Sequence, residues 1–243
     1  MNIGFPLFPD QASTIATHVD ALFLFLIAVS VFFAALISIV IVVFAIKYRR
    51  RSENERPEEI AGDLRLEILW TVIPLGLTLV MFFWGAKLFF VINDPPANSL
   101  EINVVAKQWM WKVQHPEGRL EIDELHIPVG RPVKLTMTSQ AVIHDFFGAA
   151  FRVKKDVVPG RYTTVWFEAT TPGEYHLFCS QYCGTQHSGM IGRIVVMPLT
   201  EYQAWLSGGA TGVSLATAGE RLFPKLGCNT CHRESGAGRG PSS

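Results

Sequence analysis

Two long apolar stretches constrain the fold of this chain more than any other feature. Residues 21–46 are apolar apart from two serines, and residues 66–92 are mostly apolar around Pro74 and Gly76. A helix needs about 20 apolar residues to cross the hydrocarbon layer of a membrane, and membrane helices tolerate internal proline and glycine. We therefore predict a transmembrane hairpin with helices at about 21–46 and 66–92, which follows an external N-terminal segment at 1–20.

The charges between these stretches predict the orientation of the hairpin. The connecting segment 47–65 opens with KYRRR, which places four positive charges within five residues. Such a cluster beside a membrane span marks its cytoplasmic end. We therefore expect a cytoplasmic loop at 47–65, with the N-terminus and everything after Asp94 on the outer side. Glu67, at the start of the second stretch, is either an ordinary interface residue or part of a proton path.

Beyond the hairpin the pattern changes to short runs rich in Val, Ile, Thr and aromatic residues. Turn sequences such as HPEG, PVGRP, VPG and TPG separate these runs. The candidate strands are LEINVVA (100–106), WMWKV (109–113), PVKLTMTS (132–139), YTTVWFEA (162–169), GEYHLF (173–178) and IGRIVVM (191–197). This punctuation predicts a small Greek-key sandwich or barrel at 94–207, closed by a short helix at 199–206. Equal numbers of basic and acidic residues, 21 each, argue against a nucleic-acid partner.

A short segment near the end of this domain carries soft metal ligands. The sequence CSQYCGTQHSGM contains Cys179, Cys183, His187 and Met190, and this set of thiols, imidazole and thioether suits copper. A mononuclear blue-copper centre needs one cysteine, whereas two cysteines could also form a disulfide or half of a zinc site. His144, in VIHDF, is the natural further ligand from another strand. The remaining histidines of the N-terminal segment and the strand-rich domain are expected to have ordinary surface or core roles: His18, His115, His126 and His176.

A second cysteine pair lies near the C-terminus, in the sequence CNTCH. Cys228, Cys231 and His232 match the C-x-x-C-H signature for covalent attachment of haem c. A zinc site would need a second ligand pair, and a redox dithiol would need a βαβ setting. The sequence around these residues offers neither, which favours haem c. We expect a flexible linker at 208–217 and the first part of a truncated cytochrome c domain at 218–243, in which the distal haem ligand cannot be named.

The order of ligands resembles the dinuclear copper A motif of cytochrome c oxidase subunit II. The resemblance extends to the hairpin and to the segments LEILWTVIP, QWMW, VIHDF and DVVPGRY. It implies a two-helix transmembrane hairpin, then an all-β cupredoxin-like Greek-key domain, here followed by the start of an α-helical cytochrome c domain. In the implied ligand set Cys179 and Cys183 bridge two coppers, His144 and His187 each bind one, Met190 adds a weak thioether, and Gln181 adds its backbone carbonyl.

The resemblance assigns three further roles and reveals one departure. Trp109 corresponds to the exposed residue through which electrons arrive, with Trp111 supporting it, and Glu67 to a carboxylate at the mouth of the K proton channel. The family usually has Glu where this chain has Gln181, and the Glu side chain reaches a magnesium at the boundary with subunit I. Gln181 keeps the carbonyl but lacks the negative charge that magnesium prefers, which argues against that magnesium.

The implied function is electron transfer in the bacterial inner membrane. Electrons would come from cytochrome c or another periplasmic donor, through the fused haem c, and pass to haem in subunit I. There oxygen would be reduced to water, coupled to proton translocation. The implied partners are subunits I and III and membrane lipid. The alternatives are a membrane-anchored copper carrier or electron-transfer protein outside an oxidase, and a nitrous oxide reductase-like domain, which shares the copper motif without this hairpin.

Overall fold

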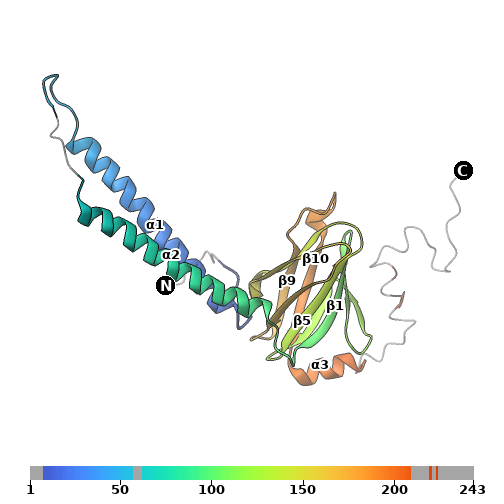
Figure 1. Cartoon of the computed structure of the whole chain (residues 1–243). Coiled ribbons are helices and arrows are strands. Elements are labelled where there is room, and N and C mark those ends of the chain that lie inside the picture. Colours follow the sequence, from blue (N-terminus) through green and yellow to red (C-terminus); the bar gives the residue numbers. More distant parts are fainter. Residues whose placement is uncertain (1–7, 57–61, 209–218, 221–222, 224–243) are drawn as a thin grey trace, which may run out of the picture. The chain divides into compact units, whose positions relative to one another are not determined.

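The computed structural model describes residues 8–56, 62–208, 219–220 and 223 (Figure 1). Two long helices come first, α1 (Ala16–Lys47) and α2 (Leu64–Asn93). Helix α1 begins five residues before the predicted start at 21 (21 − 16 = 5). Thr17, His18 and Asp20 are polar, so hydropathy alone does not include this first turn in the apolar stretch. The predicted span at about 21–46 lies within this helix.

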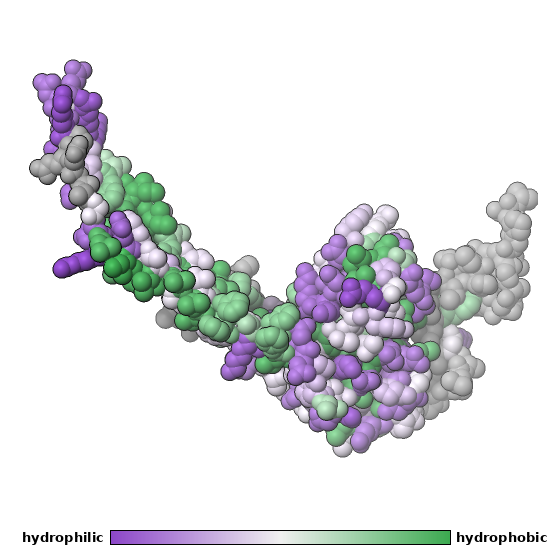
Figure 2. Space-filling view, in the orientation of Figure 1, coloured by the Kyte–Doolittle hydropathy of each residue, from purple (hydrophilic) through white to green (hydrophobic). Residues whose placement is uncertain are grey.

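Both helices present apolar side chains around their circumference. Val31, Ile39 and Phe90, for example, are 61%, 61% and 69% exposed. Figure 2 shows hydrophobic residues along both helices and hydrophilic residues at the turn between them. Each helix is long and apolar enough to cross a membrane, at 32 and 30 residues. The two helices contact each other through the rings of Phe25 and Trp84, whose centroids are 5.4 Å apart.

The strand-rich region forms two five-stranded sheets (Figure 1). The first sheet has the order β3 (Leu120–Ile122), β2 (Met110–Gln114), β1 (Leu100–Lys107), β5 (Pro132–Ser139) and β8 (Thr163–Glu168). The second has the order β4 (Glu124–Pro128), β10 (Ile191–Met197), β9 (Gly173–Cys179), β6 (His144–Gly148) and β7 (Val153–Val157). Strand β1 pairs parallel with β5, and β4 with β10, while the other pairs are antiparallel. The prediction of a helical hairpin followed by an all-β Greek-key domain is confirmed.

Three strands, β3, β4 and β7, were not predicted from the sequence, and β6 was expected only as the strand that carries His144. Strand β7 reads VKKDV, and its three central charged residues look like a loop in sequence. It lies at the edge of its sheet, where charged side chains reach solvent and discourage pairing with another chain. The helix predicted at 199–206 is present as α3 (Leu199–Leu206), in which the rings of Tyr202 and Trp205 stack. Nearly all of the predicted linker and cytochrome segment lies outside the described residues.

A buried carboxylate joins the edges of the two sheets. Glu121 on β3 accepts a hydrogen bond from the ring of His115 at 2.6 Å, and its other oxygen contacts the ring of His126 on β4. The backbone N–H of His126 also donates to Glu121, at 3.1 Å. Burial by itself would raise the pKa of Glu121, but the hydrogen bonds from His115 and His126 outweigh it and hold the pKa below its usual value. The ionised carboxylate therefore stabilises the folded domain.

We predict that Glu121→Gln destabilises the β domain and removes part of its sensitivity to acid. Loss of these bonds should lower the free energy of unfolding by roughly 1–3 kcal/mol near neutral pH. Because the folded-state pKa is depressed, this stabilisation is complete above roughly pH 4.3, the ordinary glutamate pKa, and is lost as pH falls below it. Denaturant unfolding of the full chain in detergent, measured from pH 3 to 7, tests this. The exposed Glu117→Gln is the control, and equal curves for the two variants would contradict the prediction.

Candidate metal centre

Two neighbouring strands and one loop bring the sequence-predicted ligands together. Strand β9 ends at Cys179, and the loop that follows passes through a short 3-10 helix, His187–Gly189, before β10 begins at Ile191. His144 is the first residue of β6, which pairs antiparallel with β9 and sets Phe146 opposite Cys179. Strand pairing thus places His144 beside the loop, although His144 lies 35 residues before Cys179 in the chain.

The donor atoms of these residues face one another within 4 Å. The sulfurs of Cys179 and Cys183 are 3.7 Å apart. Nδ1 of His144 is 3.8 Å from the Cys179 sulfur, and Nδ1 of His187 is 3.5 Å from the Cys183 sulfur. The Met190 sulfur is 3.9 Å from Cys183, and the backbone oxygen of Gln181 is 3.3 Å from the Cys179 sulfur. Two thiols therefore lie at the centre, each with one imidazole beside it and one weaker donor.

The chemistry of this donor set fits a soft metal cation. Residues His144, Cys183 and Met190 are 0%, 3% and 1% exposed, so water is largely excluded from them. Burial, and then the neighbouring Cys179, raises the pKa of Cys183 to about 12. Burial, and then the charge of His187, lowers the pKa of His144 and keeps its imidazole neutral. Two adjacent buried thiolates require a compensating positive charge, which a metal would supply as the thiols release their protons.

The backbone of the ligand loop is held by a second group of residues. Ser180 donates from its hydroxyl to the carboxylate of Asp145 and from its N–H to the backbone oxygen of Asp145, so the residues next to Cys179 and His144 are tied together. Gln108 donates to the backbone oxygen of Cys183 at 2.9 Å. Sequence reasoning missed these three residues. The only available signal was their position beside predicted ligands or beside Trp109.

The two tryptophans take different positions at this site. Trp111 is fully buried, and its ring packs edge-on against the rings of His144 and Phe146, with centroids 6.1 and 5.5 Å away. Trp109 is partly exposed and lies against the ligand loop at Gly184. A Cβ atom at Gly184 would lie 3.1 Å from the Trp109 ring, and the φ of +122° there also favours glycine. Trp109 is therefore the tryptophan that contacts both the loop and solvent.

The other predicted site residues lie apart from this cluster. Glu67 is in the first turn of α2, whereas Val91, near the other end of that helix, contacts the β domain. Glu67 and Val91 are 24 residues apart, which corresponds to roughly 36 Å of helix. The side chain of Gln181 is exposed, although its backbone oxygen faces the thiols. The predicted haem ligands Cys228, Cys231 and His232 lie outside the described residues.

A second cluster of potential ligand atoms contains Glu121, Glu124 and His126. Both oxygens of Glu121 already contact histidines, and Glu124 forms an ion pair with Arg193 at 2.5 Å. These groups satisfy one another, so we interpret the cluster as structural.

Comparison with known proteins yields one consistent family. Residues 117–198 match the model described as "Cytochrome C oxidase subunit II, periplasmic domain", and residues 1–87 match the corresponding transmembrane domain. The chain is 33% identical to cytochrome c oxidase subunit 2 of Alkalihalophilus pseudofirmus over 86% of this chain and 66% of that protein. It is 30% identical to cytochrome c oxidase subunit 2 of Synechocystis sp. over 84% of this chain and 76% of that protein.

Among solved structures, the chain is similar to the periplasmic domain of subunit II of cytochrome oxidase of Bradyrhizobium japonicum. The identity is 28%, the TM-score is 0.46, and the match covers 48% of this chain and 96% of that one.

We predict that Met190→Leu alters the metal centre without dismantling it. The two side chains have similar volume, so the loss of stability should stay below about 1.5 kcal/mol. Removing a thioether that donates to the oxidised metal should raise the reduction potential and shift the visible spectrum, while the amount of bound metal stays unchanged. Spectroelectrochemical titration of the full chain measures the reduction potential and the visible spectrum. Met197→Leu, at the end of β10 and outside the cluster, should leave both unchanged, and equal potentials for the two variants would contradict the prediction.

Proposed function

The chain belongs to the cytochrome c oxidase subunit II family, and we propose on that premise that it is the electron-accepting subunit of a respiratory haem-copper oxidase. In this role it receives electrons from cytochrome c, through its own C-terminal haem c, and delivers them to haem in subunit I. Oxygen is reduced in subunit I, with coupled proton translocation. The observation that carries the proposal is the convergence of two thiols, two imidazoles, a thioether and a carbonyl at one buried point.

These donors suit a dinuclear copper A centre because they divide into two similar halves. Cys179 and Cys183 would bridge, His144 and His187 would each hold one copper, and the remaining donors are the Met190 thioether and the Gln181 carbonyl. When bound, the copper pair supplies a one-electron carrier whose charge is shared over two metals.

The protein contributes a rigid, water-poor frame for this carrier. Cys179 and His144 lie on paired strands, and Ser180 and Asp145 tie their backbones together. Ligands held in this way move little when charge changes, and a protein environment that needs little rearrangement favours fast transfer. We assign the arrival of electrons to Trp109, because it is partly exposed and contacts the loop at Gly184, and a supporting position to the buried Trp111.

The remaining assignments rest on the position of residues in the hairpin and on their charge. We propose that the basic residues at 47–51 face the cytoplasm, which places the β domain on the outer side. Glu67 then lies near the cytoplasmic end of α2, where it can feed protons to the K channel of subunit I. Gln181 offers an amide in place of a carboxylate, so the proposal includes no magnesium there. Subunits I and III are the proposed partners within the membrane.

The decisive test of the copper assignment is electron paramagnetic resonance of the purified membrane complex. We expect two coppers per chain and hyperfine structure from one electron shared by two equivalent nuclei. Cys183→Ser should abolish this signal, because one bridging thiolate is lost, whereas Ser188→Ala in the same loop should retain it. A mononuclear copper signal from the unmodified chain would refute the proposal, and it is the result expected of a copper carrier or a blue-copper protein.

The haem assignment requires a separate experiment, because it depends on other residues. Replacement of Cys228 and Cys231 by serine should remove covalent haem staining at the mass of this subunit and leave the copper signal intact. Absence of haem staining in the unmodified full-length protein would refute the haem assignment but not the copper assignment.

A further inference from the structure

The segment that precedes α1 is bound to the β domain through its backbone. Ala12 donates from its N–H to the oxygen of Ala150 at 2.9 Å and accepts from the N–H of Thr170 at 2.9 Å. Thr14 donates to the oxygen of Glu168 at 3.1 Å. Residues 12–14 therefore extend along the end of β8. Such backbone pairing fixes the register of the segment where it leads into the first membrane helix.

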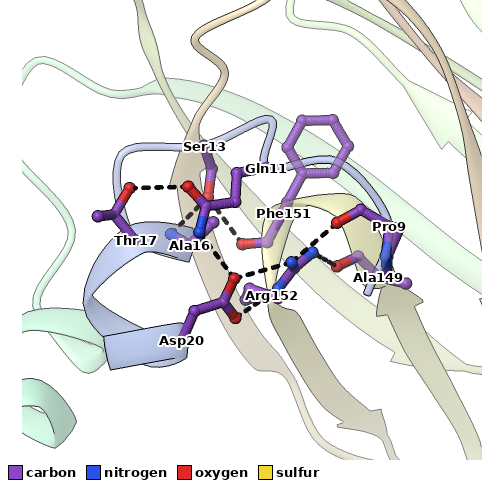
Figure 3. A network of polar contacts seen from close by, with 9 residues as sticks. All are labelled: Pro9, Gln11, Ser13, Ala16, Thr17, Asp20, Ala149, Phe151 and Arg152. Carbon is purple, nitrogen blue, oxygen red and sulfur yellow. Dashed lines mark hydrogen bonds and ion pairs between the residues drawn. The ribbon is translucent and has the colours of Figure 1, made fainter. Parts of the chain in front are cut away.

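One arginine of the β domain completes this attachment (Figure 3). The guanidinium of Arg152 donates to both carboxylate oxygens of Asp20 in α1, at 2.8 and 2.9 Å. It also donates to the backbone oxygens of Ala149 at 2.8 Å and Pro9 at 2.9 Å. The side chains of Arg152 and Asp20 are only 9% and 12% exposed. The Arg152 side chain thus connects helix α1, the segment before α1 and the turn that contains Ala149.

The helical side of this network is braced as well. Gln11 donates to Asp20 at 2.8 Å, and Thr17 donates to Gln11 at 3.2 Å. Ser13 accepts from the N–H of Ala16 at the start of α1 and donates to the backbone oxygen of Phe151 at 2.8 Å. Figure 3 shows these groups converging from the N-terminal segment, α1 and the turn before Arg152. The carboxylate of Asp20 is therefore held in place before it meets the arginine.

The arginine of this attachment lies close in the chain to a proposed copper ligand. Arg152 follows the 3-10 helix Ala149–Phe151, which follows β6, and β6 begins with His144. Arg152, which anchors α1, is thus only eight positions after His144 in the chain. A second anchor lies at the outer end of α2, where the indole of Trp166 on β8 donates to the backbone oxygen of Val91 at 3.0 Å.

We propose that Arg152 is a positioning residue, which fixes the metal-bearing domain relative to the outer end of α1. A buried ion pair is by itself weak support for stability, because apolar residues of similar size often stabilise as well. Such a pair does demand one geometry, since both carboxylate oxygens must meet the planar guanidinium. The inference rests on the proposed function, in which the electron acceptor lies in a membrane subunit and the distance to it must be kept constant.

Two variants of the assembled oxidase test the proposal. Arg152→Gln removes the charge, and Arg152→Lys keeps the charge but cannot donate to all four acceptors in one plane. Hydrogen exchange at Ala12, Thr14 and Thr170 should accelerate in both, by roughly 30- to 1,000-fold for the glutamine variant. Exchange at Ser180, in the ligand loop, should remain unchanged. Arg193→Gln is the matched control, because Arg193 also bridges two carboxylates, those of Glu124 and Glu174, but its side chain is 51% exposed and both partners lie within the β domain.

The second measurement is the rate of electron transfer from the copper centre to subunit I after flash reduction. We expect it to fall in Arg152→Gln, because electron transfer slows as the distance between donor and acceptor grows and the variant no longer fixes that distance. The copper spectrum should stay unchanged. Accelerated exchange with an unchanged transfer rate would overturn the positioning role, and unchanged exchange would overturn the attachment itself. A missing copper signal in the unmodified chain would refute the proposed function instead, while the exchange measurement would still decide the attachment.

Discussion

Strand pairing between β6 and β9 is the constraint on which the proposed metal centre depends. The last residue of β9 and the loop that leads to β10 supply both thiols, one imidazole and the thioether, but the second imidazole must come from elsewhere in the chain. Pairing of Phe146 with Cys179 brings His144 to the loop, and the buried ring of Trp111 packs against it from the other sheet. The ligands are therefore held by the core of the sandwich, whose packing leaves them little freedom to move.

The polar groups of the β domain are used to fix one arrangement of its parts. Glu121 joins the edges of the two sheets, Asp145 ties β6 to the ligand loop, and Arg152 ties the domain to α1. Each is a carboxylate or guanidinium with little contact with water, which is costly unless every polar atom finds a partner. Glu121 connects strands that are neighbours in the chain but lie in different sheets, whereas Asp145 and Arg152 connect residues 35 and 132 positions apart.

These contacts connect the apolar helices, which suit lipid, to the β sandwich, which suits water. The helices expose apolar side chains that suit lipid, whereas the sandwich buries its own apolar residues and exposes charged strands such as β7. A short peptide link between two such parts would leave their relative position free. The segment at 12–14, the Asp20–Arg152 pair and the contact of Trp166 with Val91 remove much of that freedom.

The sequence by itself determined the hairpin, the class of the outer domain and most of the proposed ligand set. These features are local, because apolar length, alternation of side chains and the spacing of Cys179, Cys183, His187 and Met190 can be read within one stretch. His144 was found through a resemblance and its strand context. The tertiary structure alone decided its contact with Cys179, the strand character of VKKDV, the partners of Glu121 and the pairing of Asp20 with Arg152, 132 residues away. Contacts of this kind depend on which strands become neighbours in the sandwich, and no local pattern encodes that choice.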